Sequence, residues 1–321
     1  MSRGAYDVAV MHDFFVDRIV RPGNLGRLFR VAGEKARAGG GSVHGVVQED
    51  IRGGNAVNLA HALARLGNRV LLITHSDAEH AGLLSKAFDG LGAELRIKPP
   101  PPGLTVALEE GVNVMLSDAG GAGSFPPSLL DGDDWKALRQ SSVICSVNWA
   151  ANVEGTELLV ALRRRLGNGK MIFLNPSDVR DRFGQYVRLV NLLKRRRIVD
   201  WVSLNEFEAA STVLALGLNS KGPRSWCAAI AGALGIRVDV HTERAVFTCT
   251  DGKLVGMSTR HLRPKRLTGA GDVWDAASIT GFLKGMEDGA RLEFANAAAR
   301  LFVGSEAPVP PTLRQVEREL R

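Results

Sequence analysis

Residues 267–285 read LTGAGDVWDAASITGFLKG, and this stretch decides how the rest of the chain is interpreted. The turn Gly269-Ala270-Gly271 runs directly into Asp272, and the residues after it are compatible with one continuous helix. Backbone N–H groups at a helix start have no partner within the helix and lie at the positive end of its dipole. The turn is therefore a candidate site for an anion such as a phosphoryl group.

Asp272 stands at the edge of this candidate anion site. A carboxylate there is poorly placed to bind a phosphoryl group and well placed to take a proton from an attacking hydroxyl. The alternative is structural, with the aspartate capping the helix and the glycines forming the loop before it. Short glycine-rich matches do not separate these two interpretations, so the other motifs must.

The composition is that of a globular protein with a sizeable core. Of the 321 residues 45% are hydrophobic, and three widely spaced cysteines argue against a disulfide framework and indicate a cytoplasmic protein. No apolar run is long enough for a membrane span, so we expect no membrane contact. The net charge is +7, but no aromatic residues alternate with the basic runs at 163–165 and 194–197, so we expect no nucleic-acid binding.

Strand and helix patterns alternate along most of the chain after residue 69. Strands are predicted at residues 70–74, 143–147, 171–174 and 201–204, and helices at 78–91, 135–139, 154–165 and 186–195. A hairpin is predicted in 105–116, two strands in 235–250, and helices at 294–302 and after residue 311. This order predicts an α/β fold with a doubly wound, mainly parallel sheet flanked by helices.

Residues 18–52 have a different texture. Strands are predicted near residues 19–20 and at 43–51, with several glycines between them and no recognisable βαβ unit. We interpret this segment as a small β lid inserted into a core made of residues 1–17 and 53–321. Its short strands leave exposed edges, which favours a homodimer built through the lid.

Polar residues follow two predicted strands at the ends where open α/β sheets bind ligands. Asp13 and Asp17 come after the first strand, at residues 8–11, and Asn148 follows the strand that ends at residue 147. For Asp17 the alternative is a turn residue, but its place favours a ligand role.

A second glycine-rich helix start lies at Gly53 and Gly54, with Asn55 and Asn58 in the first turn. Asparagine both donates and accepts hydrogen bonds, which suits sugar hydroxyls. Capping of the helix by Asn55 is the alternative, and it leaves Asn58 unexplained.

Asn205 and Glu208 open another predicted helix, one turn apart and on the same side. In one interpretation they cap a helix that has an acidic first turn. In the other they bind Mg²⁺ and phosphate through water molecules, since hard cations prefer oxygen ligands.

Taken together, these motifs resemble the ribokinase-like (phosphofructokinase-B type) carbohydrate kinase family, in the same order and across nearly the whole chain. The resemblance implies an anion hole at Gly269, Ala270 and Gly271 with Asp272 as general base. It implies acceptor-binding residues at the first glycine-rich helix and the strand ends, namely Asp13, Asp17, Gly53, Gly54, Asn58 and Asn148. It implies ATP and Mg²⁺ near Asn205, Glu208, Thr242, Arg244 and Asn296.

Three positions depart from the pattern of that family. His12 stands where a glycine usually ends the first strand, and the loop Thr242–Ala245 lacks the usual glycine. Arg266 stands near a usual acidic residue, so we expect that a monovalent cation is not bound there, because a guanidinium repels it. The alternative is an arginine turned to solvent, with the ion held by backbone carbonyls.

The resemblance implies an ATP-dependent phosphotransferase acting on a hydroxyl of a sugar or sugar-like acceptor. The acceptor is left open between a pentose, a hexose, a sugar phosphate and a nucleoside, and Trp149 either stacks on it or packs in the core. A catalytically silent nucleotide- or sugar-binding protein is the alternative from another class, although the retained Asp272 speaks against it.

Overall fold

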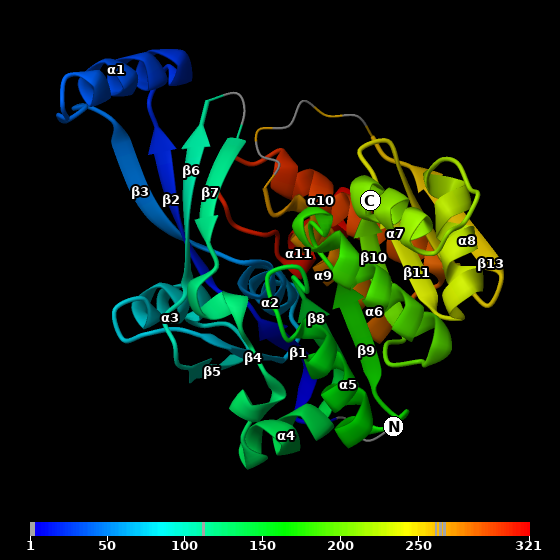
Figure 1. Ribbon diagram of the computed structural model, residues 1–321. Helices are drawn as coiled ribbons and strands as arrows, with labels where there is room; N and C mark the ends of the chain where they lie inside the picture. Colours follow the sequence, from blue (N-terminus) through cyan, green and yellow to red (C-terminus); the bar gives the residue numbers. More distant parts are fainter. Residues whose placement is uncertain (1–3, 111–112, 261, 263–264, 266–267) are drawn as a thin grey trace.

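The computed structural model describes residues 4–110, 113–260, 262, 265 and 268–321, and it contains two sheets (Figure 1). The larger sheet has the strand order β13-β12-β11-β10-β9-β8-β1-β4-β5. Its strands are β1 (Tyr6–His12), β4 (Val70–His75), β5 (Ala93–Lys98), β8 (Ser141–Val147), β9 (Met171–Asn175), β10 (Trp201–Asn205), β11 (Arg237–His241), β12 (Ala245–Thr250) and β13 (Lys253–Ser258). Along this order, each pair of neighbouring strands between β11 and β5 is parallel. The pairs β11–β12 and β12–β13 are antiparallel.

Helices cover both faces of this sheet, each through its own apolar cluster. One face packs against α4 (Gly132–Arg139), α5 (Gly155–Leu166), α6 (Phe183–Arg195), α7 (Glu206–Ala215) and α8 (Pro223–Leu234). The other packs against α2 (Asn55–Arg65), α3 (Ala81–Phe88), α9 (Ala270–Leu283), α10 (Asp288–Val303) and α11 (Leu313–Glu319). The predicted mainly parallel sheet flanked by helices is confirmed, while α8, β5 and β13 were not predicted.

The second sheet has the order β3-β2-β6-β7 and projects from the core (Figure 1). It consists of β2 (Phe15–Arg21), β3 (Val47–Gly53), β6 (Gly103–Glu109) and β7 (Asn113–Asp118), and we call it the lid sheet. The predicted hairpin at 105–116 supplies β6 and β7, so the lid sheet draws on residues outside 18–52. The predicted lid segment, residues 18–52, therefore does not coincide with the residues of the lid sheet. The division of the chain into a core and a lid segment stays a proposal.

The prediction of strands alone within residues 18–52 is wrong, because Leu25–Arg37 forms helix α1 at the tip of the lid (Figure 1). Its N-cap Asn24 accepts a hydrogen bond from the backbone N–H of Arg27. Leu25, Leu28 and Phe29 recur at helical spacing, a signal that the neighbouring glycines had obscured. No described helix is long and apolar enough to cross a membrane.

Candidate active site

The start of α2 is built around Asp13, which lies in the connection between β1 and β2. Its carboxylate accepts hydrogen bonds from the backbone N–H groups of Asn55 and Ala56, both at 2.8 Å, and from the amide of Asn148 at 2.9 Å. Gly54 is required beside it, because at its φ of 91° an added Cβ would lie 2.8 Å from the carbonyl oxygen of Asp13. Asp13 thus caps α2 from another element, and its contact with an acceptor remains a prediction.

Asp17 lies on β2 and faces a small cavity of about 80 Å³. Burial raises the pKa of Asp17 to about 6, against the hydrogen bond from Thr105 and the positive charge of Arg52. Gly53 on the neighbouring strand leaves room for this carboxylate, since an added Cβ would lie 2.1 Å from its Oδ2. The cavity is also lined by Asn58, Gly269 and a mainly apolar wall of Ile51, Val273, Phe302, Pro308 and Pro310.

Asp272 is buried in the first turn of α9, and its side chain points to α2. The amide nitrogens of Asn55 and Asn58 lie 3.2 Å from its Oδ1 and Oδ2, respectively. Gly269 is the N-cap of α9, with a φ of 84°, so the alternative in which Asp272 caps its own helix is wrong. Burial raises the pKa of Asp272 well above its usual value, the charges of Asp275 and Asp13 add to this, and the two amides oppose it.

The turn before Asp272 separates two cavities. Gly269 lines the cavity of about 80 Å³, whereas Ala270 and Gly271 line a larger one of about 630 Å³. The larger cavity is also lined by Asn205, His241, Thr242, Trp274, Asn296 and Arg300. The arrangement can therefore hold one ligand on each side of the start of α9. Asp272 follows this turn directly, and Asn58, which donates to its Oδ2, lines the smaller cavity.

Asn205 and Glu208 form a capping box at the start of α7. The side chain of Asn205 accepts from the backbone N–H of Glu208 at 2.9 Å, and Glu208 accepts from that of Asn205 at 2.8 Å. Burial raises the pKa of Glu208 to about 8, and the charges of Asp275 and Asp178 add to this. The interpretation of Asn205 and Glu208 as a helix cap is confirmed.

The same two side chains could hold a magnesium ion through water. Each of their oxygens accepts one hydrogen bond and keeps a second lone pair, which can accept from a metal-bound water. The described part of the chain also contains no group of three or more histidine, cysteine, aspartate or glutamate side chains able to hold a metal. A water-mediated role for Asn205 and Glu208 remains a prediction.

Two aromatic rings line the larger cavity. The rings of His241 and Trp274 pack against each other at an angle of 33° with centroids 5.1 Å apart, and the indole N–H of Trp274 donates to Asn296 at 3.0 Å. Thr242 lines the cavity and closes the turn between β11 and β12, since its hydroxyl accepts from the backbone N–H of Ala245 at 3.0 Å. Arg244, in contrast, lines a neighbouring open groove of about 870 Å³ and not this cavity.

Sequence reasoning missed several residues of this region. His241 and Trp274 adjoin predicted residues in the chain, and their aromatic rings could have been noted as a wall for a flat ligand. Arg52 lines the small cavity and donates to the side-chain oxygen of Asn58 at 2.9 Å, although nothing in its sequence context indicated which way it points.

Three other residues that the sequence singled out are Trp149, His12 and Arg266. Trp149 is 1% exposed and its indole N–H donates to Thr156 at 3.0 Å, so the core-packing interpretation is confirmed. His12 is buried at the end of β1, with its Nε2 3.1 Å from the carbonyl oxygen of Ala122. Arg266, on which the expected loss of a monovalent cation rests, lies outside the described residues.

Comparisons with known proteins bear on the family and the fold. A model described as "pfkB family carbohydrate kinase" matches residues 35–313. Curated proteins gave no significant match. The structure is similar to that of Arabidopsis thaliana ribokinase complexed with ribose and ATP, at 20% sequence identity, with 99% of each chain covered and a TM-score of 0.75.

Two further solved structures show the same similarity over their whole length. For ribokinase from Thermotoga maritima the identity is 17%, the coverage 98% of this chain and 99% of the other, and the TM-score 0.79. For adenosine kinase from Sinorhizobium meliloti the identity is 19%, the coverage 99% and 100%, and the TM-score 0.77. The chain therefore has the ribokinase-like fold that its motifs predicted.

Proposed function

This chain belongs to the pfkB family of carbohydrate kinases, and we propose that it transfers the γ-phosphoryl group of ATP to a hydroxyl of a small sugar or sugar-like acceptor. The observation that carries this proposal is the position of Asp272. Its carboxylate accepts hydrogen bonds from two asparagine amides of α2, and Asp272 directly follows the turn whose residues line the two cavities. A general base has to lie within reach of the acceptor hydroxyl and of the phosphoryl group that the hydroxyl attacks.

In the proposed reaction the acceptor occupies the smaller cavity and the nucleotide the larger one. Asp17 accepts hydrogen bonds from acceptor hydroxyls, and Asp272 takes the proton of the hydroxyl that reacts. The oxygen of that hydroxyl forms a bond to the γ-phosphorus while the bond from this phosphorus to the bridging oxygen breaks, and ADP leaves. Backbone N–H groups at the start of α9 stabilise the charge on the transferred group.

The nucleotide assignment uses the character of the larger cavity. The ring of Trp274 and the amide of Asn296 offer an apolar face and a polar edge for a base, and Arg300, which pairs with Glu319 at 2.9 Å, also lines the cavity. Mg²⁺, held through water near Asn205 and Glu208, would neutralise charge on the β- and γ-phosphates.

The lining of the smaller cavity is the basis for proposing a sugar acceptor. Asp17 and Asn58 offer hydrogen-bonding groups for hydroxyls, and the wall formed by Phe302, Pro308 and Pro310 is apolar. A nucleoside acceptor stays the second candidate within the same reaction, because adenosine kinase is among the similar structures.

The test is a transfer assay on a panel of pentoses, hexoses, hexose phosphates and nucleosides. ADP release is measured with and without acceptor, and the phosphorylated product is identified by ³¹P NMR. ATP, ADP and GTP are compared as donors. Acceptor-dependent ADP release with a sugar phosphate product is the expected result. Nucleotide or sugar binding without transfer to any member of the panel would support the silent binding protein instead.

A further inference from the structure

Arg52 connects the lid sheet to the candidate base. It lies near the end of β3, where its guanidinium lines the smaller cavity. Its Nη1 donates to Oδ1 of Asn58 at 2.9 Å, and its Nη2 contacts Nδ1 of His61. Both partners belong to α2, so the side chain spans from a lid strand to the helix whose asparagines orient Asp272.

The contact from Arg52 determines which way the amide of Asn58 faces. Because the oxygen of Asn58 accepts from the guanidinium, its nitrogen is left to donate to Oδ2 of Asp272 at 3.2 Å. The reversed amide would place its oxygen against the carboxylate and its NH₂ group against the guanidinium, so that both contacts become repulsive. A neutral side chain in place of Arg52 removes this preference.

His61 holds the other end of the guanidinium. It is 5% exposed, and burial together with the positive charges of Arg52 and Arg65 lowers its pKa to about 3. The ring is therefore neutral over the working pH range. Its Nδ1 accepts from Arg52, which places the ring proton on Nε2.

The charge of Arg52 also reaches both carboxylates of the site. Burial lowers the pKa of Arg52 to about 10, although the negative charges of Asp272 and Asp17 oppose this change. The guanidinium therefore stays charged at neutral pH. Asp272 in turn faces the negative charges of Asp275 on its own helix and of Asp13 from the β1–β2 connection. Arg52 thus adds positive charge to a cluster of acidic groups.

We infer that Arg52 is a positioning residue for the phosphoryl transfer, which holds the amide of Asn58 toward Asp272 and supplies positive charge to the carboxylates of Asp17 and Asp272. This inference rests on the proposed role of Asp272 as the base. Since Arg52 belongs to the lid sheet, a displacement of β3 changes the hydrogen bonding and the charge at the base. The lid is thereby coupled to the reacting groups as well as covering the cavity.

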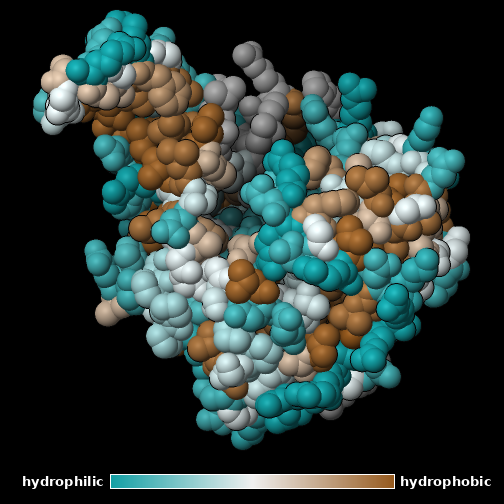
Figure 2. All heavy atoms as spheres, in the orientation of Figure 1, coloured by the Kyte–Doolittle hydropathy of each residue, from teal (hydrophilic) through white to brown (hydrophobic). Residues whose placement is uncertain are grey.

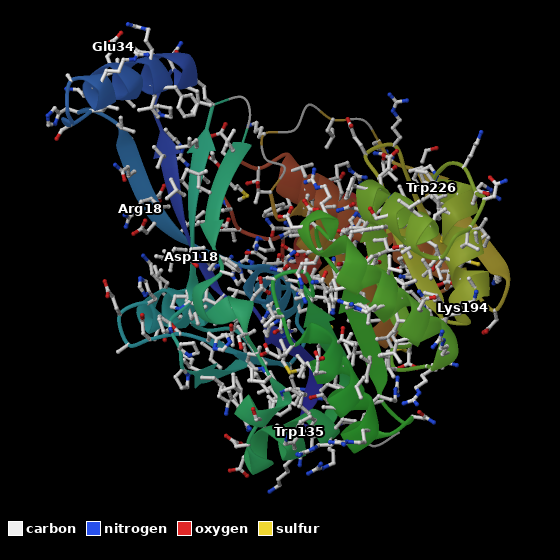
Figure 3. The ribbon with its side chains drawn as sticks, in the orientation of Figure 1. Arg18, Glu34, Asp118, Trp135, Lys194 and Trp226 are labelled. Atoms are coloured by element: carbon white, nitrogen blue, oxygen red, sulfur yellow. The ribbon has the colours of Figure 1, made fainter. Side chains whose placement is uncertain are left out.

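The test compares Arg52→Met, which removes donors and charge, with Arg52→Lys, which keeps the charge. Arg18→Met is the matched control, because Arg18 is also an arginine of the lid sheet, but it pairs with Asp50 and lies exposed on the outer side of the lid (Figure 3). The titration of Asp272 is followed by ¹³C NMR of labelled aspartate carboxyls, and the signal is assigned by its loss in Asp272→Asn.

We expect Arg52→Met to raise the titration midpoint of Asp272, because a nearby positive charge favours the carboxylate. Arg52→Lys should recover most of this shift, and Arg18→Met should show none. In turnover, Arg52→Met should lower kcat by roughly 10- to 100-fold, move its acidic limb to higher pH and leave KM for ATP unchanged.

An unchanged midpoint in Arg52→Met would overturn the inference, even if the variant were less stable or less active. If Arg52→Met does not fold, the inference is tested with Arg52→Lys alone. It is supported if kcat of Arg52→Lys is lowered while the acidic limb of its pH profile stays at the same pH as in the wild type. Wild-type kcat in Arg52→Lys would then refute the positioning role. The NMR titration needs no turnover, so a failure of the proposed kinase reaction is distinguishable from a failure of this inference.

Discussion

Replacing Gly53 by alanine tests whether Asp17 binds the acceptor. An added Cβ at Gly53 would lie 2.1 Å from Oδ2, 2.3 Å from Cγ and 2.5 Å from Oδ1 of Asp17. Ordinary contact begins at about 3.5 Å, so the carboxylate has to move by roughly 1 Å or more. A hydrogen bond to a charged group contributes about 1.5–3 kcal/mol, and its loss would lower kcat/KM for the acceptor roughly 10- to 150-fold.

The assay is steady-state kinetics with the acceptor varied at saturating ATP, together with ATP binding measured by calorimetry. The loss should fall mainly on the acceptor KM, while the affinity for ATP stays as in the wild type. Gly33→Ala is the matched control, since Gly33 lies in α1 of the lid and its added Cβ meets only the tip of Arg37, at 3.9 Å. An acceptor KM within about two-fold of wild type in Gly53→Ala would refute this reasoning.

Two further predictions concern pH and assembly. Asp17 has a raised pKa of about 6. In the proposed site its carboxylate binds acceptor hydroxyls, and protonation weakens these bonds because it removes the negative charge. The value of kcat/KM for the acceptor should therefore fall as the pH drops through about 6. A profile that stays flat down to pH 5 would contradict this. The dimer predicted through residues 18–52 remains a prediction. The lid sheet that contains part of this segment also exposes Leu104, Val114 and Leu116 at 53%, 42% and 61%, where Figure 2 shows a hydrophobic area that a second copy could cover. Light scattering that reports a monomer at micromolar concentration would exclude this dimer.

Features carried by a short stretch of sequence could be predicted. The glycine turn before Asp272 and the helix after it lie within the single stretch 269–283, and Asn205 and Glu208 lie at one helix start. The parallel sheet could also be predicted, because each strand and each helix has an apolar period that is visible within its own residues, and the two types alternate along the chain. Helix α1 was missed since Gly33 and the glycines after it suggested a loop.

Features that join distant residues could not be predicted. Asp272 is 214 residues from Asn58, and the two meet only because α2 and α9 pack side by side on one face of the sheet. The buried pair of Arg291 and Asp239, 2.7 Å apart, is separated by 52 residues and left no signal in either segment. Arg52 is close to Asn58 in the chain, but the direction of its side chain depends on how β3 leaves the lid sheet.

The central claim, that Asp272 is the base of an ATP-dependent transfer to a hydroxyl, is tested most directly by Asp272→Asn. The asparagine keeps the shape of the side chain but cannot take the proton. We predict that kcat for the best acceptor falls by about 100-fold or more, while calorimetry shows an ATP affinity within about two-fold of wild type. A variant that keeps a tenth or more of the wild-type kcat would contradict the account.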